Sequence, residues 1–467
     1  MGLIITISGL RGIIGQDLTP AIAAEYGAAF GTFLREEASV KDRRPRVCLG
    51  RDSRPSGLMI QCAVTAGLCG AGVDVIDLGI VTTPSVGIMV RHLACDGGVV
   101  VTASHNPLPY NGIKLLNGQG MAPPADTATQ IRQVFLDKRW GYVDSARCGQ
   151  VTCNTKTDAV HVDKVLALVD PGAIAAKGIK VVLDSVNGAG ARPAKRLLKD
   201  LGCKVKAIND QPTGLFAHEP EPTGENLQGL CQVVRKAKAD IGFAQDPDAD
   251  RLAIVDGDGT YLGEEYTLAL AAEWILSKTP GRVAANLSTS RMIDDIVART
   301  GGKVIRTPVG EAHVASAMIE NRCVIGGEGN GGVIDLRVGP IRDSLVAMAF
   351  VLQLMAETGR TVRQLADRIG SYTMVKEKFP AEPAQAQEVL DQARKRFSHA
   401  QVDTRDGYRF DFEDGWLHLR TSNTEPIMRV IAETRDEAAA RRYLDQVGQI
   451  RQQVMASKAR SRPHTPG

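Results

Sequence analysis

The sequence lacks the cysteine spacing of a disulfide framework or a zinc site. Its nine cysteines are scattered, odd in number and without a C-x-x-C pair, as is typical of reduced thiols in the cytosol. Long hydrophobic runs are also absent, and the short apolar stretch at residues 3–7 has neither the basic flank nor the length of a secretory signal. These absences predict a cytoplasmic protein that has no membrane partner.

An excess of charge of either sign is also missing. The 56 lysines and arginines nearly balance the 53 acidic residues, which leaves a net charge of +3 over 467 residues. A basic cluster occurs only in the tail from Ser457 onward, where Lys458, Arg460 and Arg462 stand without an acid. We expect that tail to be a solvated end, and the near-neutral body predicts no nucleic-acid partner.

The length of the chain suggests three or four domains, because it exceeds what one hydrophobic core supports. Strand and helix patterns alternate in the ranges 1–152, 153–256 and 257–370, which predicts three similar α/β domains, the first of them with a parallel sheet. The range 371–467 instead combines helices with an antiparallel hairpin and predicts a smaller α+β domain. The patterns predict strands at Lys204–Ile208 and Lys303–Thr307 and a helix at Pro383–Arg396.

A serine follows a run of β-branched residues in the first domain. Val99–Thr102 predicts a buried strand that ends at Ser104, and Pro107 stiffens the loop that presents the hydroxyl. The glycines of a G-x-S-x-G nucleophile elbow are absent, so a hydrolase triad is disfavoured. The alternatives are an ordinary loop or a phosphoryl carrier, with His105 and Lys114 near enough in sequence to neutralise the phosphoryl group or move protons.

Three alternating aspartates follow a strand of the second domain. Asp246, Asp248 and Asp250 cannot all ionise close together without a cation, so we expect a hard divalent ion. An EF-hand is excluded, because Arg251 and Gly257 occupy its glycine and bidentate-acid positions. Mg²⁺ is favoured, since it keeps open positions for a phosphoryl oxygen. The alternative is an acidic turn in which Asp250 pairs with Arg251.

Further polar groups follow strands elsewhere. Arg11 is one such group in the first domain, and Glu328 and Asn330 lie between glycines that would let a sugar approach the backbone. Guanidinium forks and hydroxyls suited to a phosphate dianion occur together in the last domain, at Arg420, Ser422, Asn423, Thr424 and Arg429. The alternative for that last set is an exposed basic turn.

Four motifs resemble, in this order, those of the α-D-phosphohexomutase family. They are the TASHNP segment at residues 102–107, the aspartate loop at 246–250, the glycine-rich loop at 327–332 and the arginine loop at 420–429. The resemblance covers essentially the whole chain and implies the heart-shaped architecture of four domains. It implies a phosphoserine at Ser104 and Mg²⁺ held by Ser104, Asp246, Asp248 and Asp250. It places around the phosphoserine Arg11, His105, Lys114 and Arg251, with Lys114 as general base. It assigns the sugar to Glu328 and Asn330, and the non-reacting phosphate to Arg420, Ser422, Asn423, Thr424 and Arg429.

The implied activity is that of an isomerase, which interconverts a hexose 6-phosphate and a hexose 1-phosphate through a phosphoserine and a hexose 1,6-bisphosphate that also serves as activator. The segments 8–12, 327–332 and 422–426 look most like the archaeal-type phosphoglucosamine mutase group, which favours glucosamine phosphate as the small-molecule substrate. A phosphomannomutase/phosphoglucomutase is the alternative, although Gly332 stands where those enzymes usually carry histidine. We expect a monomer or a homodimer.

Two rivals belong to other classes. A haloacid-dehalogenase-like phosphatase also uses alternating aspartates after a strand, but its second aspartate is followed by x and Thr or Val, where this chain has Asp250. A sugar-phosphate sensor would bind the ligand without turnover, even with the bisphosphate present.

Overall fold

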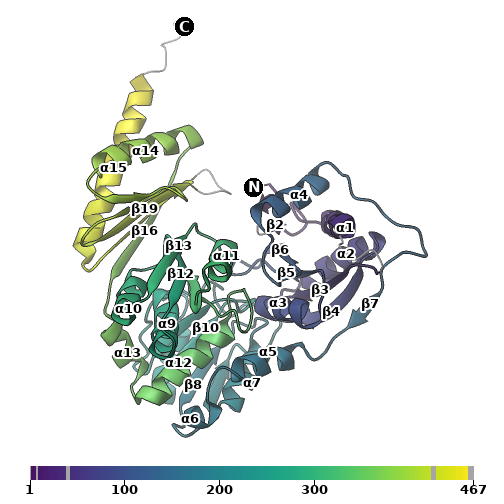
Figure 1. Cartoon of the computed structure of the whole chain (residues 1–467), viewed down its shortest axis with the longest axis horizontal. Helices are drawn as coiled ribbons and strands as arrows, with labels where there is room; N and C mark the ends of the chain where they lie inside the picture. Colours follow the sequence, from purple (N-terminus) through teal and green to yellow (C-terminus); the bar gives the residue numbers. More distant parts are fainter. Residues whose placement is uncertain (1, 7–8, 38–42, 422–426, 461–467) are drawn as a thin grey trace.

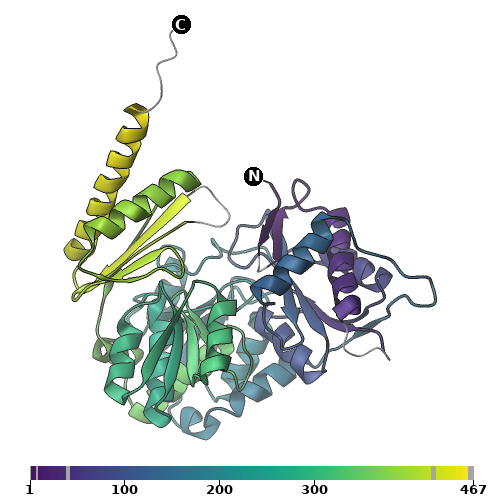
Figure 2. The same ribbon diagram turned by 45° about the horizontal axis from the view of Figure 1, so that its top comes forward.

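The computed structural model describes residues 2–6, 9–37, 43–421 and 427–460, with side chains up to residue 456. It confirms the predicted fold class, with three α/β domains followed by a smaller α+β domain, each built on a sheet of its own. The domains form an arc whose two ends are the first and the fourth domain (Figures 1 and 2).

The first sheet is mixed, and its strand order is β1-β2-β6-β5-β3-β4-β7. The strands are β1 (Ile4–Thr6), β2 (Gly9–Ile13), β3 (Arg46–Arg51), β4 (Asp74–Ile80), β5 (Gly97–Val101), β6 (Tyr110–Asn117) and β7 (Val151–Cys153). The helices are α1 (Pro20–Glu37), α2 (Gly57–Gly70), α3 (Thr83–His92) and α4 (Ala125–Leu136).

The predicted parallel arrangement therefore holds for only part of this sheet. Strands β5, β3, β4 and β7 are parallel, whereas β6 pairs antiparallel with both β2 and β5. The reason lies in the short connection between Val101 and Tyr110, which leaves no room for the crossover that a parallel return requires. That connection is the serine loop.

The second and third domains repeat this arrangement on four-stranded sheets, with strand orders β11-β10-β8-β9 and β13-β12-β14-β15. In each, the last strand returns antiparallel after a short polar loop. The strands are β8 (Lys180–Asp184), β9 (Lys204–Ile208), β10 (Ile241–Gln245), β11 (Leu252–Asp256), β12 (Arg282–Asn286), β13 (Lys303–Thr307), β14 (Ile325–Glu328) and β15 (Gly332–Ile334). The helices are α5 (Thr157–Leu166), α6 (Pro171–Ala175), α7 (Ala191–Asp200), α8 (Gln228–Ala237), α9 (Glu265–Lys278), α10 (Met292–Thr300), α11 (Glu311–Asn321), α12 (Ser344–Thr358) and α13 (Val362–Ile369).

Helix α12 lies in the largest hydrophobic core, which the second and third domains share. Every residue from Ser344 to Ala356 is buried, which explains why this helix is apolar on all sides. No single helix in the described ranges is long and apolar enough to cross a membrane, and α12 and α13 meet that length-and-composition test only as a pair bent by 93°.

The fourth domain is a five-stranded antiparallel sheet with strand order β16-β20-β19-β18-β17. One face packs on two helices through an aromatic core around Phe397, and the other face carries the polar contacts to the third domain. The strands are β16 (Thr373–Pro380), β17 (Gln401–Asp403), β18 (Tyr408–Asp411), β19 (Gly415–Thr421) and β20 (Ile427–Thr434), and the helices are α14 (Pro383–Arg396) and α15 (Glu437–Arg460).

Candidate active site

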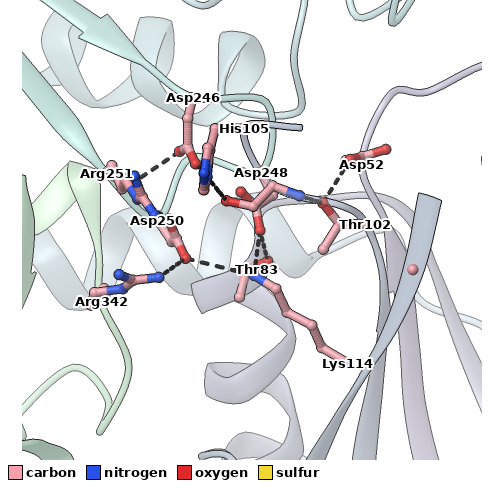
Figure 3. A network of polar contacts seen from close by, with 12 residues as sticks. Asp52, Thr83, Thr102, His105, Lys114, Asp246, Asp248, Asp250, Arg251 and Arg342 are labelled. Atoms are coloured by element: carbon pink, nitrogen blue, oxygen red, sulfur yellow. Dashed lines mark hydrogen bonds and ion pairs between the residues drawn. The ribbon is translucent and has the colours of Figure 1, made fainter. Parts of the chain in front are cut away.

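The serine loop and the aspartate loop meet between the first and second domains (Figure 3). The Ser104 hydroxyl donates to Oδ2 of Asp246 at 3.0 Å and lies 3.3 Å from Nδ1 of His105. Ser104 is only 4% exposed, and its φ of 50° places it in the left-handed region. A non-glycine residue holds that conformation only where its surroundings enforce it.

Arg54, which the sequence patterns did not identify, holds Ser104 in this conformation. Its guanidinium is fully buried and pairs with Asp52 at 3.1 Å. It donates at 2.7, 2.7, 3.0 and 3.0 Å to the backbone carbonyls of Ser104, Asn106, Pro107 and Tyr110. Asp52 also accepts from Thr102 Oγ1, which in turn accepts from the Ser104 amide. The serine is therefore presented by a rigid, internally bonded loop.

The three predicted metal ligands are brought together as expected from their spacing. Asp246, Asp248 and Asp250 are buried, and one carboxylate oxygen from each lies within 4.8 Å of the others. Burial, reinforced by the other two carboxylates, raises the pKa of Asp246 well above its ordinary value. Such a cluster is unfavourable without a compensating cation.

Two orphaned oxygens test whether this cluster suits a metal. Oδ1 of Asp248 and Oδ1 of Asp250 are buried and accept no hydrogen bond from any described residue. Buried carboxylate oxygens without a donor cost free energy, and hard oxygen donors are what Mg²⁺ prefers. The residues present therefore fit a divalent cation coordinated by these oxygens.

Cationic groups surround the cluster. Lys114 Nζ lies 2.8 Å from Oδ2 of Asp248 and 3.6 Å from Oδ2 of Asp250. Burial alone would lower the pKa of Lys114, but these two carboxylates outweigh it and raise the pKa. Lys114 is thus an ammonium here, and it acts as a base only after it has given up this proton. The same ammonium outweighs the effect of burial on Asp248 and lowers that carboxyl's pKa.

The other predicted neighbours of the serine lie beside it. Arg11 donates to Oδ1 of Asn106 at 2.6 Å, and the Arg251 amide donates to Oδ1 of Asp246 at 3.1 Å. Burial, together with the nearby guanidinium groups of Arg251 and Arg11, lowers the pKa of His105 to about 2. His105 is therefore a neutral imidazole in this environment.

Arg342, which the sequence analysis also missed, links the aspartate loop to the glycine-rich loop. It donates to Oδ2 of Asp250 at 2.6 Å, to Oε2 of Glu328 at 2.7 Å and to Oε2 of Glu311 at 3.0 Å. Arg251 lies 4.0 Å from Asp250, so the closer partner of this aspartate is Arg342 and not its neighbour in sequence.

The predicted sugar loop is therefore tied to the metal loop through one guanidinium. Glu328 is 3% exposed and also accepts from Asn286 Nδ2 at 2.8 Å and from the Gly310 amide at 3.0 Å. Oδ1 of Asn330 lies 3.4 Å from the Arg342 guanidinium. Both predicted sugar ligands thus sit beside Arg342, with the Glu328 carboxylate engaged by protein donors.

The arginines of the fourth domain lie apart from this cluster. Arg420 on β19 stands directly opposite Arg429 on β20. Arg420 also donates from Nε to Oδ1 of Asp406 at 3.2 Å. The remaining predicted phosphate ligands, Ser422, Asn423 and Thr424, fall outside the described residues.

Four domain models match the chain in order along its length. They are phosphoglucomutase/phosphomannomutase alpha/beta/alpha domain I at residues 3–140, domain II at 159–259, domain III at 263–372 and the C-terminal domain at 373–449.

Full-length relatives match as well. A phosphoglucomutase/phosphomannomutase of Thermococcus kodakarensis is 39% identical over 95% of this chain and 97% of its own length. A probable phosphoglucosamine mutase of Methanopyrus kandleri is 38% identical over 96% and 97%. Among solved structures, a phosphoglucomutase/phosphomannomutase family protein from Burkholderia thailandensis superposes with a TM-score of 0.85 at 28% identity, over 97% of this chain and 98% of that one.

Proposed function

This chain belongs to the phosphoglucomutase/phosphomannomutase family of phosphohexomutases, and we propose that it interconverts glucosamine 6-phosphate and glucosamine 1-phosphate. The observation that carries the proposal is the Ser104 hydroxyl, held 3.0 Å from a buried cluster of three carboxylates. A serine so placed is suited to carry a phosphoryl group whose charge a divalent cation offsets.

The proposed reaction has two phosphoryl transfers. In the first, the Oγ–P bond of phosphoserine 104 breaks as phosphorus bonds to the free hydroxyl oxygen of the sugar phosphate. The hydroxyl proton leaves, Oγ regains a proton, and a hexose 1,6-bisphosphate results. After this intermediate turns over in the site, the second transfer moves the phosphoryl group from the other end back to Oγ, with the protons moving in reverse.

The charged residues around Ser104 have separate parts in this scheme. When bound by Asp246, Asp248 and Asp250, Mg²⁺ would withdraw charge from the transferring group. Arg11 and Arg251 offer guanidinium donors to phosphoryl oxygens. Neutral His105 stabilises the loop conformation beside Oγ, and Lys114 gives a proton to the departing oxygen or, once deprotonated, accepts one from the attacking hydroxyl.

Binding of the sugar and of the distal phosphate falls to the third and fourth domains. We assign the sugar hydroxyls to Glu328 and Asn330, which would exchange part of their bonds with Arg342 for bonds to substrate. We assign the non-reacting phosphate to Arg420, Ser422, Asn423, Thr424 and Arg429. One such site serves both phosphates in turn, because the sugar presents each end to Ser104 once per cycle.

The choice of glucosamine rests on the sequences of the loops at 8–12, 327–332 and 422–426 and on the name of the Methanopyrus kandleri relative, a probable phosphoglucosamine mutase. The name of the Thermococcus kodakarensis relative supports the alternative, a phosphoglucomutase/phosphomannomutase. The choice of sugar is tested by comparing kcat/KM for the 1-phosphates of glucosamine, glucose, mannose and N-acetylglucosamine. Each assay contains a catalytic amount of hexose 1,6-bisphosphate as activator. We expect glucosamine 1-phosphate to give the highest value, and a higher value for glucose or mannose would reassign the sugar.

The same assay separates the mutase from its rivals. Release of inorganic phosphate without formation of the isomer would indicate a phosphatase. Binding of the sugar phosphate without turnover would indicate a sensor.

A further inference from the structure

A buried chain of hydrogen bonds joins three domains beside the aspartate loop. Ser85 belongs to the first turn of α3, His161 to α5, and Asp343 precedes α12. Oγ of Ser85 lies 2.8 Å from Nδ1 of His161, whose Nε2 lies 2.7 Å from Oδ2 of Asp343. Their exposed fractions are 0%, 0% and 2%, so a solvent-shielded network spans the first, second and third domains.

The partners of Asp343 set the direction of its bond to His161. Asp343 caps α12, since its Oδ1 accepts from the amides of Leu345 and Val346 at 2.9 and 3.4 Å. The remaining oxygen, Oδ2, accepts the proton on Nε2 of His161, and in a neutral imidazole this leaves Nδ1 to accept from the Ser85 hydroxyl. The order resembles a Ser-His-Asp triad. However, the serine is fully buried and its hydroxyl also contacts Thr82 Oγ1 at 2.8 Å, so no substrate reaches it.

Residues next to Ser85 and Asp343 in sequence hold the aspartate loop from two sides. From the first domain, Thr83 donates from Oγ1 to Oδ2 of Asp248 at 2.6 Å and from its amide to the Asp248 carbonyl at 2.9 Å. From the third domain, Arg342 donates to Oδ2 of Asp250 at 2.6 Å and Ser344 Oγ donates to the Ala249 carbonyl at 2.7 Å. Thr83 is two residues from Ser85, and Arg342 and Ser344 flank Asp343.

We propose that His161 is a positioning residue. By bonding both Ser85 and Asp343, it joins the first-domain clamp (Thr83) to the third-domain clamp (Arg342 and Ser344), and it thereby fixes the spacing of Asp248 and Asp250 around the divalent cation. The inference rests on the proposed function, because it concerns the metal that the aspartate loop would hold. Without the imidazole, each clamp stays attached to its own domain, and small shifts between domains pass directly to the carboxylates. Partners that orient metal ligands typically change metal affinity or activity by about 10- to 100-fold when removed.

The test measures Mn²⁺ affinity of the full chain by calorimetry, together with mutase kinetics. His161→Phe removes both bonds, and we expect Mn²⁺ affinity and kcat each to fall by about tenfold or more. We expect KM for the hexose phosphate to change little, because its distal phosphate is assigned to the fourth domain. His161→Asn and His161→Gln each retain one of the two bonds, and we expect intermediate losses.

Val165→Ala is the matched control, because Val165 is fully buried on the same helix and packs in the core that the second and third domains share. It lowers stability by opening a cavity but leaves both clamps joined, so its Mn²⁺ affinity should equal that of the wild type. Equal losses of affinity in His161→Phe and Val165→Ala would overturn the inference, because they would indicate general destabilisation.

Three further results are decisive. Wild-type affinity in the Asn and Gln variants would overturn the inference even if His161→Phe does not fold. A wild-type chain that binds no Mn²⁺ and needs no metal would instead overturn the proposed function and, with it, the metal that His161 is inferred to serve. Metal-dependent wild-type turnover with unaffected His161 variants overturns the inference alone.

Discussion

Oγ of Ser104 lies 3.0 Å from Oδ2 of Asp246, although 142 residues separate the two in sequence. Both follow a buried strand at the point where the chain returns antiparallel, from β5 to β6 and from β10 to β11. The return from β14 to β15 carries Glu328 and Asn330 in the same way. Three domains thus deliver their reactive loops from equivalent positions, and the site forms where these loops converge.

Replacing Ser104 tests the phosphoryl carrier. We expect Ser104→Ala to retain less than about 1% of wild-type turnover with an unchanged fold, because the hydroxyl is the proposed carrier and its removal is a small change. After incubation with a hexose 1,6-bisphosphate, intact-mass analysis should show one phosphate on the wild type and none on the variant. Ser277→Ala, at the exposed end of α9, should behave as wild type. A tenth of wild-type activity in Ser104→Ala would contradict the covalent role.

Metal removal tests the aspartate loop. We expect exhaustive chelation to abolish turnover and added Mg²⁺ to restore it. Asp248→Asn should weaken metal affinity and kcat together, because it removes one charged oxygen from a set of three. Asp367→Asn is the control, since that side chain is 65% exposed on α13. Full activity in the chelated enzyme would contradict a metal role for this loop.

The strands and loops that sequence patterns predicted are those whose signals are local. β9 and β13 have the predicted bounds Lys204–Ile208 and Lys303–Thr307, and α14 has the predicted bounds Pro383–Arg396. Ser104 and the three aspartates could be found in the same way, because each loop follows its own buried strand. The antiparallel strand β6 was not predicted, because hydrophobic periodicity carries no information on strand direction, whereas the length of the serine loop does.

Arg54, Arg342 and His161 could not be found by such patterns. Arg54 acts on backbone carbonyls about 50 residues away, and Arg342 acts on a carboxylate 92 residues away. The role of Arg54 arises only when the first domain folds, and the roles of Arg342 and His161 arise only when domains pack. An arginine or histidine in a helix or loop is usually a surface residue. One signal was available for Arg342: it directly precedes the Asp-Ser start of the apolar run at 345–356, so it had to lie near a buried helix terminus.

Removing Arg342 should reveal how much the buried charges depend on it. Arg342→Ala leaves the carboxylates of Asp250, Glu328 and Glu311 without their shared partner, and breaking such a pair typically costs about 3–5 kcal/mol. We therefore expect a fall in unfolding free energy of about that size in urea titrations. Arg441→Ala is the control, because Arg441 and Glu437 form a pair that is 58% and 57% exposed and contributes little. Equal effects of the two substitutions would refute a structural role for the Arg342 network.

The interface between the third and fourth domains should weaken in acid. His418 is fully buried, lies 2.9 Å from Ser288 Oγ and bonds the Asp406 carbonyl at 2.7 Å. Burial, assisted by nearby arginines, lowers its pKa to about 4. The unfolded chain therefore binds a proton between about pH 6.5 and 4 that the folded chain does not, so stability falls as the pH falls through this window.

The measurement for this prediction is the slope of unfolding free energy against pH from 7.5 to 4.5. His418→Gln retains a donor towards Asp406 but cannot be protonated, so its slope should be flatter than that of the wild type. Parallel slopes would show that another group causes the acid sensitivity.

The last prediction concerns the pair of arginines on β19 and β20. Arg420 and Arg429 are directly opposite each other, and like charges in that relation are destabilising unless an anion lies between them. Arg420→Ala relieves this repulsion but also removes the 3.2 Å bond to Asp406, so we expect only a small net change in stability. It should lower kcat/KM by about thirtyfold, the equivalent of about 2 kcal/mol for a charge-assisted phosphate contact. Arg394→Ala, on helix α14 of the same domain, controls for the loss of one positive charge.

The separate changes in kcat and KM distinguish a residue that positions the substrate from one that only attracts it. Binding energy at a phosphate remote from Ser104 positions the reacting hydroxyl, so kcat should fall as KM rises. Arg420→Lys keeps the charge without the fork and should remain impaired. If the grip also draws the fourth domain inward to exclude water, small-angle scattering should give a smaller radius of gyration with a hexose 1,6-bisphosphate bound. An unchanged radius of gyration, together with wild-type kinetics in Arg420→Ala, would contradict both the phosphate-binding role of Arg420 and the inward movement of the fourth domain, because neither could then depend on this guanidinium.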